Sequence, residues 1–251
     1  MKDYHKDYSY YYNILTQHKD YKSEVELLVS LLKRYGYSNS SKFLSIGCGI
    51  GMHENLLAKY FDKIIAIDNS SHMIANARKL NNHKNIEFSS CNLENLNADN
   101  FNIAISLFNV INCIESSASL SSFISDVSNK INSGGLFIFE VWNKRAIELV
   151  PPKVITREYK QENVSLKRVA KPKLELKKSL LTLNYLISGI DKDNRVNIKS
   201  THKIYLYSLS QIEYILKEKG FGEFKWFTAL SDGLNKLQDE DRMALCQAKK
   251  I

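Results

Sequence analysis

The sequence predicts an α/β fold built on an open, doubly wound sheet of mostly parallel strands, and three observations lead to it. Near-continuous apolar runs alternate with amphipathic segments through the first 150 residues, as expected of parallel strands buried on both faces and joined by helices. The first run passes directly into three glycines, Gly47, Gly49 and Gly51. The second run ends in Asp68, at the kind of strand end where such sheets bind ligands.

The individual elements follow from the apolar runs and the segments between them. Ser70 and Ser71 are candidate N-caps, because their hydroxyls can accept a backbone N–H left free at a helix start. We expect strands at 42–47, 63–68, 85–91, 101–107 and 135–142, and helices at 52–60, 70–81 and 118–131.

The C-terminal segment predicts one more helix and a strand pair. Ser208 and Gln211 have the spacing of a capping box, in which two side chains satisfy backbone donors reciprocally. Gly220 suits the end of a helix over 209–219. The apolar and aromatic runs at 224–230 and 242–248 then predict a terminal hairpin.

Between residues 151 and 206 the pattern changes to runs that alternate, such as 153–159 and 195–201, with a turn at 191–194, which is typical of antiparallel strands. We therefore expect about four antiparallel strands inserted after the fifth core strand. On this interpretation residues 1–150 and 207–251 form the core, and 151–206 form an insertion that covers one side of the site or an oligomer interface.

Composition is that of a globular protein, with 44% apolar and 25% charged residues in 251. No apolar run approaches the length of a membrane-spanning helix, and the first eight residues lack the apolar stretch of a secretory signal. The four cysteines are scattered without a C-x-x-C pair, so we expect reduced thiols, no metal site and a cytoplasmic protein.

The net charge of +8 is concentrated in one segment. Between Pro151 and Leu180 nine basic residues stand against three acidic ones. Such a patch can attract an anionic partner, either nucleic acid or a nucleotide-linked substrate. The other interpretation is a lysine-rich solvated sheet face, which discourages edge-to-edge association. Both interpretations stay open at this point.

The glycine turn and Asp68 together indicate a ligand that contains a nucleoside, because an acidic side chain there can accept both ribose hydroxyls. The dinucleotide fingerprint requires Gly or Ala at position 52, which is Met52 here. The compact G-x-G-x-G followed by an acidic strand end instead resembles motif I of class I S-adenosylmethionine-dependent methyltransferases. That resemblance implies a Rossmann-like sheet whose terminal hairpin adds one antiparallel strand.

Further phrases resemble a bacterial small-molecule branch of this family, which includes N-methyltransferases of amino sugars. They are Ser106-Leu-Phe-Asn-Val-Ile111, Gly134 to Asn143, Tyr11 to Leu15 and Lys19 to Glu24. The resemblance implies a polar small-molecule acceptor, such as the amino or hydroxyl group of a nucleotide-linked sugar, and a role in sugar biosynthesis. It also raises a homodimer as an expectation, without any membrane partner.

The resemblance further implies which residues contact S-adenosylmethionine. The glycine turn, with Cys48 inside it, approaches the methionine portion, and Asp68 holds the ribose. The remaining expected contacts are Asn69 and Met73 beside the adenine, Cys91, Asn92 and Leu93 at its border, Leu107 and Asn109 below the transferable methyl, and Tyr12 and Tyr21 above it.

Two of these positions depart from the branch. Asn92 stands where Asp is usual, and Asn109 where His is frequent. An amide oxygen can still accept a hydrogen bond from the adenine amino group, although without the assistance of a charge. A cofactor-binding relative without catalytic activity is therefore kept as an alternative.

The candidates for a catalytic base are Glu140, at the ligand-binding end of the fifth strand, and His202 on the insertion. An amine acceptor can react without a base, whereas a hydroxyl needs its proton removed. An RNA methyltransferase that uses the basic insertion is the rival enzyme. Against base methylation, the chain has Leu107-Phe-Asn-Val110 where a [D/N]-P-P-[Y/F] phrase is usual, and no cysteine follows a proline.

Overall fold

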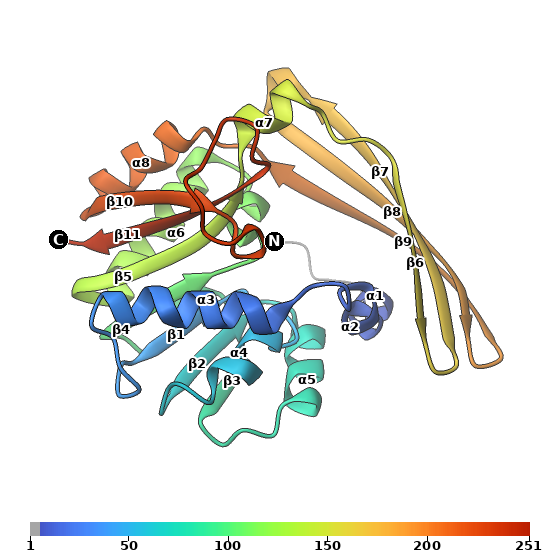
Figure 1. Ribbon diagram of the computed structural model, residues 1–251, viewed down its shortest axis with the longest axis horizontal. Coiled ribbons are helices and arrows are strands. Elements are labelled where there is room, and N and C mark those ends of the chain that lie inside the picture. Colours follow the sequence, from blue (N-terminus) through green and yellow to red (C-terminus); the bar gives the residue numbers. More distant parts are fainter. Residues whose placement is uncertain (1–5) are drawn as a thin grey trace.

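The computed structural model describes residues 6–251, so the first eight residues, used above to argue against a secretory signal, lie partly outside this range. The described chain forms two sheets (Figure 1). The larger has seven strands in the order β10-β11-β5-β4-β1-β2-β3. Its strands are β1 (Phe43–Ile46), β2 (Ile64–Asp68), β3 (Ile86–Ser90), β4 (Phe101–Ser106), β5 (Ile131–Trp142), β10 (Phe221–Thr228) and β11 (Met243–Lys250).

The predicted mostly parallel sheet is confirmed. Strands β1 to β5 pair in parallel, whereas β11 runs antiparallel to both β5 and β10. One face is covered by α6 (Ser117–Lys130) and α8 (Leu209–Glu218), and the other by α3 (Tyr21–Arg34), α4 (Met52–Leu57) and α5 (Ser71–Leu80). Neighbouring strand residues such as Phe43 and Leu44 are buried in opposite layers, which explains why the core strands read as continuous apolar runs.

Several predicted boundaries were wrong by a few residues. Helix α4 ends at Leu57 rather than Tyr60, because a turn closes there with Tyr60 N donating to Leu57 O at 2.8 Å. Strand β5 begins at Ile131 rather than 135, since its pairing with β4 shifts register next to the exposed Gly134. Strand β10 starts at Phe221 rather than 224 and contains a bulge.

Helix α3 had no predicted boundaries. Its start is defined by Asp20, whose carboxylate accepts the Ser23 backbone N–H at 3.0 Å, the usual contact of an N-cap. Two short helices precede it, α1 (Lys6–Tyr10) and α2 (Tyr12–Leu15). A further short helix, α7 (Lys144–Leu149), follows β5. No described helix has the length and apolarity needed to cross a bilayer.

The predicted antiparallel insertion after β5 is confirmed as a four-stranded sheet of β6 (Ile155–Gln161), β7 (Val164–Glu175), β8 (Leu180–Asp191) and β9 (Asn194–Tyr205). This sheet stands beside the core, with α1 and α2 between the two (Figure 1). Leu166, Ile187 and Ile198 of the sheet are buried against Tyr8 and Leu15 of these helices. Asn76 Nδ2 in α5 donates to Ser9 O at 3.0 Å, so the N-terminal helices contact both the insertion and the core.

Candidate functional site

The glycine turn after β1 is shaped by close backbone packing. Gly47 and Cys48 donate their N–H groups to Ile67 O at 2.8 and 3.0 Å, which ties the turn to β2. Gly47 has φ +73°, and a Cβ there would lie 2.4 Å from Val110 Cγ2. Gly49 has φ +57°, yet a Cβ there would meet no described atom within 4 Å. Gly49 therefore turns toward open space, as a backbone that receives a ligand must.

Asp68 joins three chain segments at this edge. Its Oδ2 accepts the Gly49 N–H at 2.9 Å and its Oδ1 accepts the Ser70 N–H at 2.8 Å. Its backbone oxygen accepts the Cys91 N–H at 3.1 Å, which fixes the end of β3. The carboxylate is thereby oriented toward the glycine turn, and each carboxylate oxygen can accept more than one hydrogen bond.

The residues expected around the adenine differ in exposure. Met73 and Leu93 are buried, Asn69 and Cys91 are half-buried, and the Asn92 side chain is exposed. All five belong to the segments that follow β2 and β3, next to Asp68. In the turn itself, burial and the nearby carboxylates of Glu54 and Asp68 raise the pKa of the Cys48 thiol, so this cysteine stays protonated.

The turn after β4 carries the strain of the site. Phe108 and Asn109 both lie in the left-handed region, with φ +59° and +66°, which is uncommon for residues with a Cβ. The Leu107 side chain is buried. Asn109 Oδ1 is also buried and has no hydrogen-bond donor among the described residues. A buried acceptor without a donor is costly unless a ligand supplies one.

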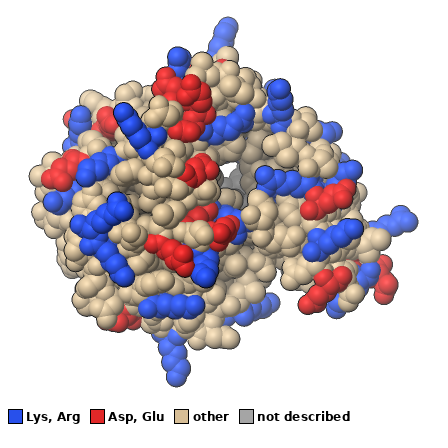
Figure 2. Space-filling model, in the orientation of Figure 1, with Lys and Arg blue, Asp and Glu red and all other residues tan. Residues whose placement is uncertain are grey.

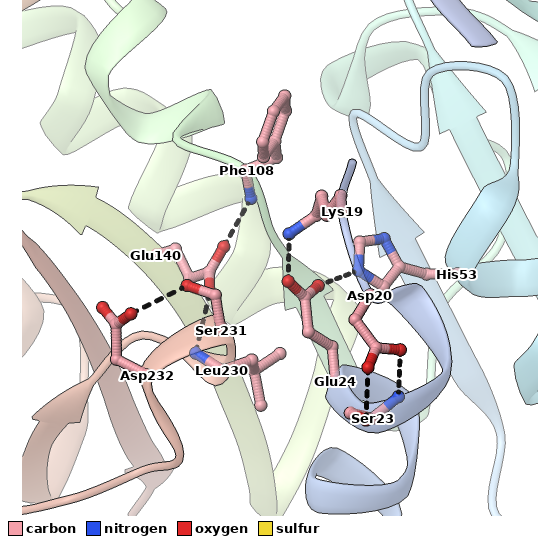
Figure 3. Close-up of polar contacts among 10 residues, drawn as sticks. All are labelled: Lys19, Asp20, Ser23, Glu24, His53, Phe108, Glu140, Leu230, Ser231 and Asp232. Atoms are coloured by element: carbon pink, nitrogen blue, oxygen red, sulfur yellow. Dashed lines mark hydrogen bonds and ion pairs between the residues drawn. The ribbon is translucent and has the colours of Figure 1, made fainter. Parts of the chain in front are cut away.

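The Glu140 carboxylate accepts a hydrogen bond from the backbone of this turn. Its side chain is 3% exposed. Its Oε2 accepts the Phe108 N–H at 2.9 Å, and its Oε1 accepts the Leu230 N–H at 3.2 Å (Figure 3). Leu230 begins the short helix η4 (Leu230–Asp232) after β10. One carboxylate therefore connects the loops that follow two different strands.

A buried ion network that the sequence did not predict lies on the other side of the turn. Glu24 accepts from Lys19 and contacts His53 Nε2 at 2.8 Å (Figure 3). Burial alone would raise the pKa of Glu24, but the His53 contact and the Lys19 ammonium outweigh it and hold that pKa below its usual value. The Lys19 ammonium also lies 5.0 Å from the centre of the Phe108 ring. The Lys19 to Glu24 segment, noted in the sequence only for its resemblance to the family, was the feature from which this ion network could have been predicted.

The two tyrosines expected above the methyl group lie in different surroundings. The Tyr21 ring is 4.9 Å from the His53 ring, beside the glycine turn. The Tyr12 ring is 6.0 Å from the Tyr8 ring, on the side of the insertion. The two rings therefore pack against different aromatic partners.

His202 belongs to an aromatic cluster on the inner face of the insertion. Its ring lies 5.0 Å from Tyr8 and 4.9 Å from Tyr185, and its Nε2 is 2.8 Å from Ser200 Oγ. Burial, assisted by the Arg168 charge, lowers the pKa of His202 to about 4. His202 is therefore neutral near pH 7 and a weak base. Among the described residues no hydrogen bond or ring contact joins His202 to Glu140.

The basic segment is divided between the two faces of the insertion. Arg168 pairs with Arg157 across β6 and β7, on the face of the buried Leu166, and lies 5.1 Å from the Tyr185 ring. Lys167, one residue away, is exposed and points to the opposite face, because side chains alternate along a strand. Figure 2 shows a hollow between the core and the insertion with basic side chains on the insertion side.

Comparison with known proteins identifies this arrangement. A family model described as a methyltransferase domain matches residues 43–135, from β1 through Asp68 and the 107–109 turn into β5. The seven-stranded sheet with its antiparallel β11 is the fold that the glycine motif had predicted for this family. The chain is a class I S-adenosylmethionine-dependent methyltransferase.

Relatives of the methyltransferase are distant in sequence and close in fold. A dTDP-3-amino-3,6-dideoxy-alpha-D-glucopyranose N,N-dimethyltransferase of Streptomyces fradiae is 23% identical over 213 residues, which is 84% of this chain and 82% of that protein. The crystal structure of DesVI from Streptomyces venezuelae has a TM-score of 0.81 at 17% identity and covers 100% of both chains. CalS10, an amino pentose methyltransferase of Micromonospora echinaspora with S-adenosylmethionine bound, has a TM-score of 0.76 at 15% identity, over 100% of this chain and 99% of that chain.

The cofactor of this methyltransferase is S-adenosylmethionine, and the residues present fit it. The open side of Gly49 leaves room for a ligand against the backbone, and Asp68 is oriented toward that turn by two backbone amides. A ligand with ribose hydroxyls has donors that the Asp68 oxygens can accept.

Proposed function

We propose that the methyltransferase methylates the amino group of a nucleotide-linked amino sugar. The observation that carries this proposal is the extent of the likeness, which includes the insertion and not the cofactor half alone. The alignment with the amino pentose methyltransferase covers 100% of this chain. A relative whose substrate is a dTDP-linked amino sugar aligns with 84% of it. The same acceptor class is proposed here on that support.

The chemistry of the site favours nitrogen over oxygen as the methyl acceptor. A hydroxyl needs a base that removes its proton in the transition state, whereas a neutral amine already carries a free lone pair. Both Glu140 oxygens accept backbone N–H groups, and the pKa of His202 is about 4, so neither is well suited to remove a hydroxyl proton. An amine acceptor does not require either.

The residues of the core have binding and orienting roles in this proposal. When bound, S-adenosylmethionine supplies an electrophilic methyl group, and the protein provides alignment and a site from which water is excluded. We assign Asp68 to the ribose and the Gly47–Gly51 turn to the methionine portion. Asn69, Met73, Cys91, Asn92 and Leu93 are assigned to the adenine, and Leu107, Asn109, Tyr12 and Tyr21 to the surroundings of the methyl group.

The insertion is proposed to hold the nucleotide end of the acceptor. Arg168 and Arg157 pair across neighbouring strands on its inner face, and guanidinium groups bind phosphates through paired hydrogen bonds. The Arg168 guanidinium is 5.4 Å from the Tyr159 ring and 5.1 Å from the Tyr185 ring, so the aromatic rings limit its positions. We accordingly keep residues 151–206 as a substrate-covering unit on a core of 1–150 and 207–251.

The test is turnover with matched acceptors. The protein is incubated with S-adenosylmethionine and either a dTDP-linked 3-amino sugar or its 3-hydroxy counterpart. The masses of the products are then measured by mass spectrometry. We expect the mass of one or two methyl groups on the amino sugar only. Methylation of the hydroxyl counterpart alone, or of RNA but of neither sugar, would contradict the proposal.

A pair of neighbouring substitutions provides the matched control. Arg168→Gln removes a charge from the inner face and should raise the KM for the nucleotide sugar about tenfold, the usual cost of a lost charge-assisted contact. Lys167→Gln removes the same charge from the outward face and should leave that KM within about twofold, as expected of an exposed site. Equal effects of the two substitutions would exclude the inner face as the nucleotide site.

A further inference from the structure

Glu140 occupies an environment that is unusual for a proton acceptor. It lies inside β5, where it pairs with Leu245 of β11, and it is 3% exposed. Its two oxygens accept the N–H groups of Phe108 and Leu230 at 2.9 and 3.2 Å (Figure 3). A carboxylate engaged in this way by two fixed backbone donors is suited to hold loops in position.

The loop that Glu140 holds is the one that needs support. Phe108 and Asn109 are consecutive residues with positive φ, +59° and +66°. Backbone of this kind persists only where its surroundings enforce it, and it clusters at functional sites. Burial does not enforce it here, because the Phe108 side chain is 46% exposed. The hydrogen bond from Phe108 N to Glu140 is the described contact that fixes the backbone of the first strained residue, since the Lys19 ammonium contacts only its ring.

The second strained residue presents the polar group of the turn. Asn109 Oδ1 is buried without a described donor, while the Asn109 backbone oxygen accepts the Asn112 N–H at 3.1 Å. The direction of the Asn109 side chain therefore depends on the φ angles of the turn. A change at Phe108 would be transmitted directly to the Asn109 amide.

We propose that Glu140 is a positioning residue, which holds the Leu107–Asn109 turn in its left-handed conformation and so sets where Asn109 Oδ1 meets the acceptor amine. This inference rests on the proposed function, since it assigns the turn to the amine. It differs from a general base in a measurable way. A base acts through its proton affinity, whereas a positioning carboxylate acts through the backbone that it holds.

A double-mutant cycle separates the two roles. Glu140→Gln retains one acceptor oxygen but turns an NH₂ group toward one of the two backbone donors, so one hydrogen bond is lost. Phe108→Gly relieves the strain at its source, because glycine adopts positive φ without a steric penalty. If Glu140 supports the strained turn, its substitution should matter less once position 108 no longer needs support.

Kinetics give the first readout. With Phe108 present, Glu140→Gln should lower kcat/KM for the amino sugar about tenfold, mainly through a higher KM, and leave the shape of the pH profile unchanged. In the Phe108→Gly background the same substitution should cost less than about threefold. An equal loss in both backgrounds, or loss of the acidic limb of the pH profile, would overturn the positioning role.

A matched control tests whether Phe108→Gly acts only by relieving the backbone strain of this turn. Asn100 has φ +61° just before β4, at the opposite end of that strand from the Leu107–Asn109 turn. Asn100→Gly should leave the basal activity and the cost of Glu140→Gln unchanged. Rescue by Asn100→Gly as well as by Phe108→Gly would mean that general stability, rather than the turn, is being measured.

Hydrogen exchange gives a readout that needs no methyl-accepting substrate. Glu140→Gln should speed exchange of the Phe108 or Leu230 amide about tenfold relative to the parent, because one of them loses its acceptor. Unchanged exchange rates at both amides would contradict the proposal that Glu140 fixes the Leu107–Asn109 turn. If the parent methylates no amino sugar while these amides respond, the proposed acceptor is wrong and the hold on the turn stands.

Discussion

The Asp68 carboxylate accepts two backbone amides, one from Gly49 and one from Ser70. The glycine turn and the start of α5 therefore share one side chain. Because these donors are backbone groups, they fix the carboxylate without adding a competing charge. Removal of this side chain should affect cofactor binding and local geometry together.

Asp68→Ala should weaken binding of S-adenosylhomocysteine about ten- to hundredfold, since a hydrogen bond to a charged group contributes about 1.5–3 kcal/mol. Isothermal titration calorimetry measures the dissociation constant. Asp62→Ala is the matched control, because Asp62 is an exposed aspartate just before β2 and should leave the affinity unchanged. An unaltered affinity in Asp68→Ala would remove this residue from the ribose site.

Local residues of the site were predictable from sequence, and distant partners were not. Gly47, Gly49 and Asp68 follow apolar strands directly, so their position at one sheet edge could be inferred. The partners of Glu140 lie on loops far away in the chain, and no periodicity links them. The contact between Glu24 and His53 likewise depends on how α3 packs beside α4.

Among the helices and strands, local caps were likewise predictable from the sequence, whereas tertiary contacts of the cap residues were not. Ser70 rather than Ser71 caps α5, with its hydroxyl accepting the Met73 N–H at 3.4 Å. At α8 only half of the predicted capping box forms. The Ser208 hydroxyl accepts the Gln211 N–H at 3.1 Å, but the Gln211 side chain donates to Ser117 Oγ at 2.7 Å. A tertiary contact with α6 has replaced the local one.

Helix α1 and the insertion meet at His202, a half-buried histidine that is neutral near pH 7, so this junction should be sensitive to acid. The described groups that face His202 include Tyr8 of α1, Tyr185 of β8, Arg168 of β7 and Ser200 of β9. Its pKa falls from 6.5 to about 4 because burial, assisted by the Arg168 charge, disfavours the charged form. The unfolded chain therefore binds more protons between these two pH values, and stability falls as pH drops through that window.

His202→Phe should remove this sensitivity while keeping an aromatic ring in the cluster. Between pH 7.5 and pH 5 the parent should lose about 2 kcal/mol more free energy of unfolding than the variant. Urea unfolding at both pH values measures the difference. The exposed His83 offers a control, since His83→Gln should retain the full loss of the parent. Parallel pH dependence in parent and His202→Phe would show that the surroundings of His202 do not lower its pKa.

At the scale of the whole molecule, two sheets have different tasks in this account. The seven-stranded sheet provides the strand ends that carry Asp68 and the two turns, and the insertion provides a basic inner face across the hollow in Figure 2. The N-terminal helices touch both. The arrangement explains why the cofactor half follows a recognisable motif, whereas the acceptor half depends on how the two sheets face each other.

If the glycine turn and Asp68 bind S-adenosylmethionine, this ligand should stabilise the native protein against thermal unfolding. At a hundredfold excess over its dissociation constant, a ligand of the native state adds about 2.7 kcal/mol, which is roughly 5–10 °C in Tm for a chain of this size. We expect such a rise with S-adenosylmethionine and S-adenosylhomocysteine and none with NAD. A Tm that rises with NAD alone, or with none of the three, would contradict it.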